Sequence, residues 1–213
     1  MMAIKRALNF DISGIDACVV SHQHGDHSKY IKDLLKCGVK VLALPDVFDA
    51  WGIKNRVFCN AIQPRHGYKV GDWRIIALPV VHDVPCVGFL IEHDEMGRTL
   101  FITDTMMLEY KVPRVSHFML ECNYADDVLQ ANIDSGVVLP VMRERLLRSH
   151  MELHTTKNII KANDKSMLED VILVHLSEHN SDRERFKREI ESVAGVPTYI
   201  ALPGLEIQLG KML

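Results

Sequence analysis

The sequence predicts an α/β fold in a single domain that spans residues 1–213. Apolar runs of four to eight residues, bounded by Gly, Pro, Asp and Asn, recur along the chain and alternate with helix-period segments in its second half. A chain of 213 residues is long enough to bury one substantial core. Its 47% hydrophobic and 25% charged residues exclude the disordered, collagen-like and disulfide-scaffold classes.

The apolar runs give the expected strands, and the segments with helical spacing give the expected helices. A turn at 94–97 separates two of the runs, and Gly97 there can take a positive φ. We expect strands at 17–21, 39–43, 74–81, 87–92, 99–103, 118–121, 171–174 and 199–201. We expect helices at 28–36, 126–133, 141–150, 155–162 and 181–193.

The charge and cysteine content narrow the function classes. A net charge of -3 gives no overall attraction to nucleic acid or to an anionic membrane, so any such contact must be local. The five cysteines form no CxxC pair, which fits a reducing compartment. The chain has neither an apolar signal core nor a run long enough to span a membrane. We therefore expect a soluble, cytoplasmic protein without membrane partners.

Four of the apolar runs end in a side chain that could bind a metal. These terminal residues are His22, His82, Asp104 and His175. Strand ends of an α/β sheet can converge on one crevice, so side chains far apart in the sequence can face a common site. Imidazole and carboxylate groups suit zinc, iron or manganese. The repetition predicts a metal site at the strand ends.

A second signal is local, because the segment 22–27 reads HQHGDH between an expected strand and an expected helix. Alternation along an extended turn would point His22 and His24 one way, while Asp26 and His27 could serve a neighbouring position. One loop could thus supply ligands to two ions. Taken singly, each histidine is better explained as a core or solvated residue. Together with the three later strand-end residues, they favour a metal site.

We also expect structural roles for residues within and just after this loop. We expect Gly25 to leave room for a sharp bend. Ser28 stands where a hydroxyl could cap the following helix, and by residue type Asp26 is an equally good cap. Capping is the structural alternative to a ligand role for Asp26.

The HxHxDH pattern with its later strand-end residues resembles the metallo-β-lactamase superfamily. The resemblance implies an αββα sandwich and two divalent ions, zinc being favoured and manganese the alternative. It implies that one ion is held by His22, His24 and His82, that the other is held by Asp26, His27 and His175, and that Asp104 bridges both. No cysteine stands at a ligand position, which disfavours antibiotic hydrolysis of the β-lactamase type.

Further stretches at 82–89, 120–124, 148–151 and 175–180 resemble the YycJ/WalJ-like subgroup, which lies near nucleic-acid phosphodiesterases such as RNase Z. They are also similar to phage anti-Pycsar phosphodiesterases. This likeness implies a phosphodiesterase that hydrolyses cyclic nucleotides through a hydroxide bridging the two metals. Neither Ser21 nor Cys18 has the context of a catalytic triad, so a covalent mechanism is disfavoured.

Asp26 and His150 are the expected catalytic residues. His150 follows a helix with three arginines, so it could donate a proton to a leaving oxygen while the arginines hold an anion. The alternative is a solvated basic helix face with a histidine at its C-terminus. The arginines are Arg143, Arg145 and Arg148. Weaker candidates, which could line the pocket or orient His175, are Asn123, Ser177, His179 and Asn180.

One departure from the family pattern concerns the N-terminus. The family's HxHxDH strand follows an N-terminal β-hairpin that is missing here, and the chain begins at what resembles the preceding helix, about 4–9. Alternative functions are a single-strand DNA or RNA exonuclease, a thioester or lactone hydrolase, and a truncated metal-binding protein without activity. The expected partner is a small phosphodiester or a nucleic-acid end, and the resemblance is compatible with a homodimer.

Overall fold

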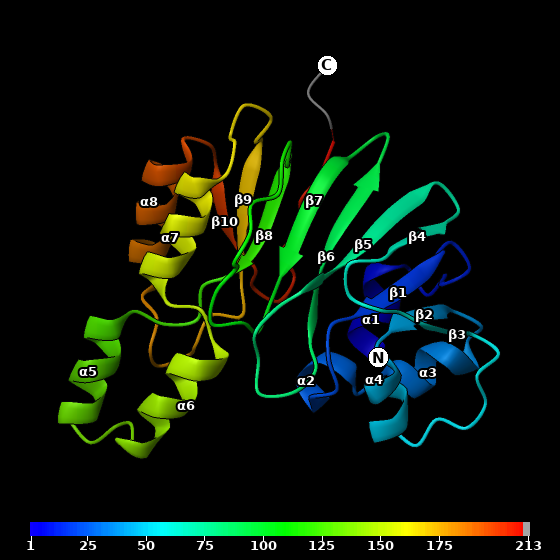
Figure 1. Cartoon of the computed structure of the whole chain (residues 1–213), viewed down its shortest axis with the longest axis horizontal. Helices are drawn as coiled ribbons and strands as arrows, with labels where there is room; N and C mark the ends of the chain where they lie inside the picture. Colours follow the sequence, from blue (N-terminus) through cyan, green and yellow to red (C-terminus); the bar gives the residue numbers. More distant parts are fainter. Residues whose placement is uncertain (211–213) are drawn as a thin grey trace. The chain divides into compact units, whose positions relative to one another are not determined.

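A computed structural model describes residues 1–210, which divide into two compact units. Unit 1 comprises Met1–Pro79 and Val84–Val87. Unit 2 comprises Val80–Asp83 and the chain from Gly88 onward. Figure 1 shows the strands and helices of both units. The expectation of a single domain stays a prediction.

Unit 1 contains a parallel three-stranded sheet with β2 (Lys40–Ala43) between β1 (Ala17–Val20) and β3 (Cys59–Ala61). Its helices are α1 (Met2–Ala7), α2 (Gly25–Ser28), α3 (Ile31–Lys36) and α4 (Pro45–Ala50). The central strand is buried, and α3 and α4 add Ile31, Leu34, Val47 and Phe48 to the core. Strands β4 (Gly67–Val70) and β5 (Trp73–Pro79) form an antiparallel hairpin.

Unit 2 is built on strands in the order β10-β9-β8-β7-β6. They are β6 (Val87–His93, whose first residue lies in unit 1), β7 (Gly97–Ile102), β8 (His117–Glu121), β9 (Asp170–Val174) and β10 (Thr198–Ile200). Only the β6–β7 pair is antiparallel among these strands. The helices are α5 (Asp126–Asp134), α6 (Val141–Ser149), α7 (Leu153–Ala162) and α8 (Arg183–Ala194). Helix α8 packs on β9 and β10, with α7 beside it (Figure 1).

The core of unit 2 explains why these runs are strands. Most buried side chains of β6 to β9 are aliphatic or aromatic, and they stand on both faces of the strands, as in a sheet whose two faces are shielded. Because β7, β8 and β9 are parallel, their carboxyl ends lie at the same edge. Asp104 and His175 follow β7 and β9, and Glu121 ends β8. The fold therefore brings these three residues to one edge of the sheet.

The structure confirms the α/β class and all eight expected strands, with bounds that differ by no more than two residues. Gly97 has the expected positive φ, 81°. Elements β3, β4 and α4 were not expected, because they are short and carry no clear apolar period. The expected helix at 28–36 is wrong at its start, since α2 and α3 are separate helices. Among the described residues, no helix is long and apolar enough to cross a membrane.

Candidate metal centre

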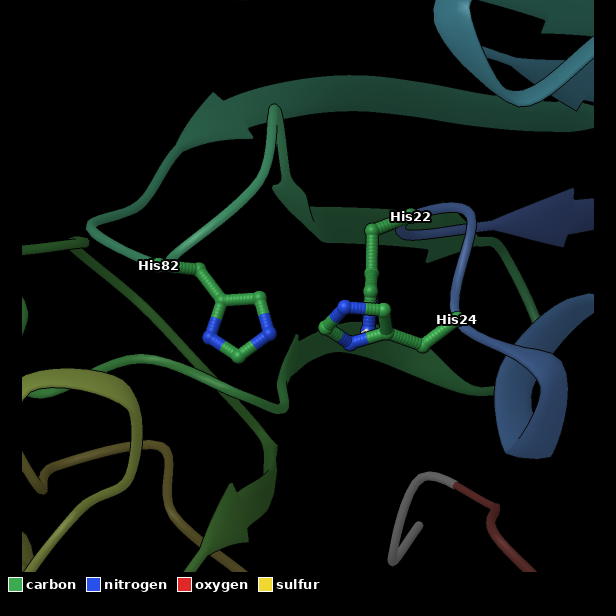
Figure 2. Close-up of side chains that lie close together, drawn as sticks. All are labelled: His22, His24 and His82. Atoms are coloured by element: carbon green, nitrogen blue, oxygen red, sulfur yellow. Dashed lines mark hydrogen bonds between the residues drawn. The ribbon is translucent and has the colours of Figure 1, made fainter. Parts of the chain in front are cut away.

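The loop after β1 gathers three imidazole rings within unit 1. His22 is fully buried, and its Nδ1 lies 3.0 Å from the Ser21 hydroxyl. Its Nε2 lies 3.0 Å from His24 Nδ1 (Figure 2). The ring of His27 is centred 4.4 Å from that of His22. The short motif thus folds back on itself and concentrates nitrogen donors.

Helix α2 begins inside the motif and so carries Asp26 and His27. Asp26 Oδ2 lies 3.3 Å from His27 Nε2, and the Asp26 side chain is exposed. The residue at the N-cap is His24, and no side chain caps α2. The capping alternative for Asp26 is therefore wrong, and its carboxylate stands beside a histidine instead.

Ser28 closes this loop from the inside. Its hydroxyl lies 2.9 Å from the Gln23 carbonyl and 2.7 Å from the His24 carbonyl, and it accepts a hydrogen bond from Trp51 Nε1 at 2.7 Å. The expected N-cap role of Ser28 is wrong, because Ser28 ends α2. Gly25 has no positive φ and open space around it, so the bend does not require a glycine. The Ser28 hydroxyl holds the loop in shape.

The second group of residues lies in unit 2 around Glu121, which sequence reasoning missed as a site residue. Glu121 is fully buried. One carboxylate oxygen lies 2.7 Å from His150 Nδ1 and 3.0 Å from His175 Nδ1. The other accepts hydrogen bonds from the backbone N–H groups of Thr105 (2.9 Å) and Met151 (3.2 Å). A signal for it was present, since Glu121 also ends an apolar run.

Asp104 completes the cluster with the same two histidines. Its Oδ1 lies 2.7 Å from His175 Nδ1 and 3.5 Å from His150 Nδ1. Donor atoms of Asp104, Glu121, His150 and His175 all lie within 4.8 Å of one another. Asp104 and His175 have φ values of 47° and 57°, in the left-handed region that non-glycine residues rarely adopt. Such strained backbone persists where the surrounding structure imposes it, and it concentrates at functional sites.

The two buried carboxylates set the electrostatics of this cluster. Burial alone would lower the pKa of His150, but its hydrogen bonds to the carboxylates of Asp104 and Glu121 raise it to about 9. The same balance raises the pKa of His175 to about 10. The cluster therefore carries a negative potential that favours cations.

His82 belongs to unit 2 through the segment Val80–Asp83. Its position on the loop after β5 is visible in Figure 2. The Val81 N–H donates to Thr105 Oγ1 at 3.0 Å, which fixes the segment. His82 Nδ1 donates to the Ser149 carbonyl at 3.0 Å, because a carbonyl can only accept. Burial lowers the pKa of His82 despite the nearby Asp83 carboxylate, and this favours the neutral ring with Nε2 as the ligand atom.

The donors of both units fit divalent metal ions. They are imidazoles and carboxylates, which suit zinc or manganese. In His82 and His175 one ring nitrogen contacts a carbonyl or carboxylate of the protein, an arrangement that orients a histidine for metal binding through its other nitrogen. No cysteine belongs to the candidate metal-binding groups of the described residues. The roles of individual ligands stay predictions.

The arginines of α6 fit a solvated helix face better than an anion site. Arg143 donates to Asp126 at 2.6 Å and to Gln130 at 2.8 Å. The side chain of Arg148 is 80% exposed and lies 3.9 Å from Glu144. Arg145 is also exposed.

The weaker candidates divide into two groups. The Asn123 side-chain amide donates to the His175 carbonyl at 2.8 Å, so it supports the strained residue. The loop that holds Ser177, His179 and Asn180 is instead tied to α5, because Asn132 donates to the His179 carbonyl at 2.8 Å and to Asn180 Oδ1 at 3.0 Å. Among these residues, Asn123 has the clearest link to the cluster.

Comparisons with known proteins point to one family. The family model described as "Beta-lactamase superfamily domain" matches residues 3–176 of the chain. This range includes every expected metal ligand. No curated protein matches the chain significantly.

Several solved structures share the fold. The metallo-β-lactamase fold protein YhfI from Bacillus subtilis is 19% identical, with a TM-score of 0.71 over 95% of this chain and 82% of that one. A diphosphatase of the PhnP family is 17% identical, with a TM-score of 0.60 over 98% and 78% of the two chains. The short form of human tRNase Z is 14% identical, with a TM-score of 0.56 over 90% and 78%. At these identities the likeness concerns the fold.

Proposed function

The chain belongs to the Beta-lactamase superfamily domain family, and we propose that it is a binuclear metal-dependent phosphodiesterase. Both the family and the His/Asp clusters are typical of metal-dependent hydrolases. The observation that carries the proposal is the buried pair Asp104 and Glu121, which holds His150 and His175 at the carboxyl ends of parallel strands.

The donors divide into two proposed sets. His22, His24 and His82 would hold one ion, Asp26, His27 and His175 the other, and Asp104 would serve both. The proximity of donors within each unit and the Nδ1 bonds of His82 and His175 support this assignment. When bound, two divalent cations supply a hydroxide nucleophile at neutral pH and neutralise charge that develops on phosphate oxygens.

His150 is the proposed proton donor to the leaving oxygen. Its Nδ1 is fixed against Glu121 at 2.7 Å, and the ring is partly exposed. A histidine held through one nitrogen keeps the other for proton transfer to a substrate atom. Glu121 positions this ring, and Asp26 acts in catalysis as a ligand.

The proposed substrate is a cyclic mononucleotide. A net charge of -3 favours a small phosphodiester over a long polyanion, whose binding depends on many basic contacts. Two proteins with a similar fold are named a diphosphatase and a tRNase, which supports chemistry at phosphorus. The competing substrate is the end of a nucleic-acid strand.

One experiment separates these substrates. The purified chain, loaded with zinc or manganese, is incubated with cyclic mononucleotides and with 5′-labelled single-stranded DNA, and products are resolved by chromatography. We expect linear mononucleotide from the cyclic substrate and no trimming of the DNA. Asp26→Ala and His82→Ala should abolish turnover while the thermal unfolding of the metal-free proteins stays near that of the unmodified chain. Trimmed DNA alone would replace the proposal with an exonuclease, and turnover without metal would refute it.

A further inference from the structure

Unit 1 contains a pocket that is separate from the loop of candidate metal ligands. It has a volume of about 270 Å³ and is formed by α3 together with the segment 53–58, which lies between α4 and β3 in the chain. Small-molecule sites in proteins are typically clefts of about 300–1,000 Å³, so this pocket suits a small ligand. None of its lining residues belongs to the motif 22–27. The lining includes Lys32, Leu35, Lys36, Ile53, Val57 and Phe58.

Part of this lining is apolar although it faces solvent. Val57 is 76% exposed and Phe58 is 39% exposed. The Val57 N–H donates to the Asn55 side-chain oxygen at 3.1 Å, which shapes the segment. The Phe58 ring lies beside the end of α3, because a Cβ at Gly38 would be 3.9 Å from Phe58 Cζ. Single exposed apolar side chains are common, but two that line one pocket offer apolar contact to a ligand.

Two lysines add positive charge to the pocket. Lys32 and Lys36 are exposed and lie one turn apart on α3, so they share a face of the helix. Within residues 1–210 neither lysine forms an ion pair with a carboxylate, and Lys32 Nζ instead lies 6.0 Å from the centre of the Trp51 ring. The neighbouring Arg56, by contrast, is paired with Asp49. The positive charge of the pocket is therefore not compensated by the chain.

We propose that this pocket binds a small amphipathic carboxylate. The apolar chain of the ligand would contact Leu35, Val57 and Phe58, and its carboxylate would lie beside Lys32 and Lys36. The uncompensated lysines disfavour a neutral or cationic ligand, and the apolar lining disfavours a simple inorganic anion. A long polyanion fits less well, because its binding depends on many basic contacts and only two lysines line the pocket.

A series of ligands tests the chemistry of this site. Isothermal titration calorimetry of the full chain should show saturable binding of octanoate at one site. Hexanoate, which is two methylenes shorter, should bind about 15-fold more weakly, because each buried methylene adds to the affinity. Octanol, acetate and octylammonium each lack the charge, lack the chain or reverse the charge, and each should bind more weakly than octanoate. Acetate or octylammonium that binds as tightly as octanoate would overturn the inference.

A charge placed in the apolar lining tests the location. Val57→Glu sets a carboxylate beside the proposed position of the ligand, so octanoate binding should fall below detection. Val57→Gln is the matched control, because it has the same length without the charge and should keep saturable binding. Both variants should unfold near the temperature of the unmodified chain, since Val57 is exposed. Equal octanoate affinity in the two variants would place the ligand elsewhere and overturn the inference.

The two lysines are tested together. Lys32→Gln with Lys36→Gln should weaken octanoate binding by about 2–30-fold, because exposed ion pairs are individually weak. Lys5→Gln with Lys69→Gln removes the same charge from unit 1 outside the pocket and should leave the affinity unchanged. An equal effect of the two double changes would mean that only net charge matters, and it would overturn the inference.

Octanoate binding must also be independent of the proposed metal centre, because a carboxylate can bind a metal ion directly. The octanoate affinity should therefore be the same with and without zinc. Amide chemical shifts, measured by NMR during the titration, should change mainly at 32–36 and 53–58. Binding that requires zinc would overturn the inference, and that result would leave the proposed hydrolase activity unaffected.

Discussion

The two groups of candidate metal-binding side chains are organised in different ways. In unit 1, the donors lie within the six residues 22–27, and one buried hydroxyl, Ser28, holds the loop. In unit 2, the donors come from the ends of separate elements, and the buried carboxylate of Glu121 holds two of them. A local motif can supply donors through chain connectivity, whereas a long-range cluster needs a buried group to orient its histidines.

Removal of that carboxylate should give the largest effect. Glu121→Ala leaves the N–H groups of Thr105 and Met151 without an acceptor, at a cost of about 1–3 kcal/mol each. It also releases His150 and His175, so metal affinity should fall by roughly 10–100-fold. Thermal unfolding and competitive zinc titration measure the two effects.

Glu121→Gln is the control for this change, because it keeps the shape of the side chain but has a single acceptor oxygen. Its thermal stability and its zinc affinity should both lie between those of the unmodified protein and those of Glu121→Ala. Equal zinc affinity in all three proteins would contradict the positioning role of Glu121.

The corresponding change in unit 1 is Ser28→Ala. It removes the bonds to Gln23 and His24 and leaves Trp51 Nε1 without its acceptor, so unfolding free energy should fall by about 1–3 kcal/mol. Ser13→Ala, at an exposed serine of the same unit, should change it by less than about 0.5 kcal/mol. If the two variants unfold at the same denaturant concentration, Ser28 does not hold the loop.

Gly88 in unit 2 and Gly25 in unit 1 differ in the space around them. A Cβ at Gly88 in β6 would lie 2.3 Å from Ile102 Cδ1 and 3.0 Å from the Phe101 carbonyl, so Gly88→Ala should cost about 1–3 kcal/mol. At Gly25 nothing lies within 4 Å, and Gly25→Ala should be neutral or stabilising by up to about 1 kcal/mol. Urea denaturation of both variants provides the measurement. Similar destabilisation at both positions would show that the Gly25 bend does need a glycine.

The smallest effect concerns a buried ion pair in unit 2. His117 Nδ1 lies 2.9 Å from Asp170, and its Nε2 lies 2.9 Å from the Met96 carbonyl. Burial alone would lower the pKa of His117. The hydrogen bond to Asp170 and the other groups around His117 outweigh this effect, so the pKa of His117 lies above the ordinary value of 6.5. The stabilising contribution is then complete below about pH 6.5 and is lost as pH rises through the folded-state pKa.

Asp170→Asn tests this pH dependence. The difference in unfolding free energy between the unmodified protein and the variant should be greatest in mildly acidic solution and should shrink as the pH rises. A difference that grows with pH would reverse the assigned sign.

The sequence predicted what depends on local order. The segment 22–27 was identifiable because its donors are contiguous, and the strands were identifiable because their apolar runs are continuous. Glu121 was missed because its role depends on His150 and His175, which only the fold brings to it. Ser28 was misassigned because α2 begins three residues earlier than expected, within the motif itself. Long-range hydrogen bonds decided the role of Glu121, and the early start of α2 decided that of Ser28.

The metal content of the chain tests the proposed binuclear centre. After loading with zinc and dialysis, elemental analysis should find about two ions per chain. It should find about one in a variant with His22→Ala and His24→Ala, and about one in His175→Ala, because each change removes donors of a different set. No retained metal in the unmodified chain, or an undiminished content in both variants, would contradict the proposed binuclear centre.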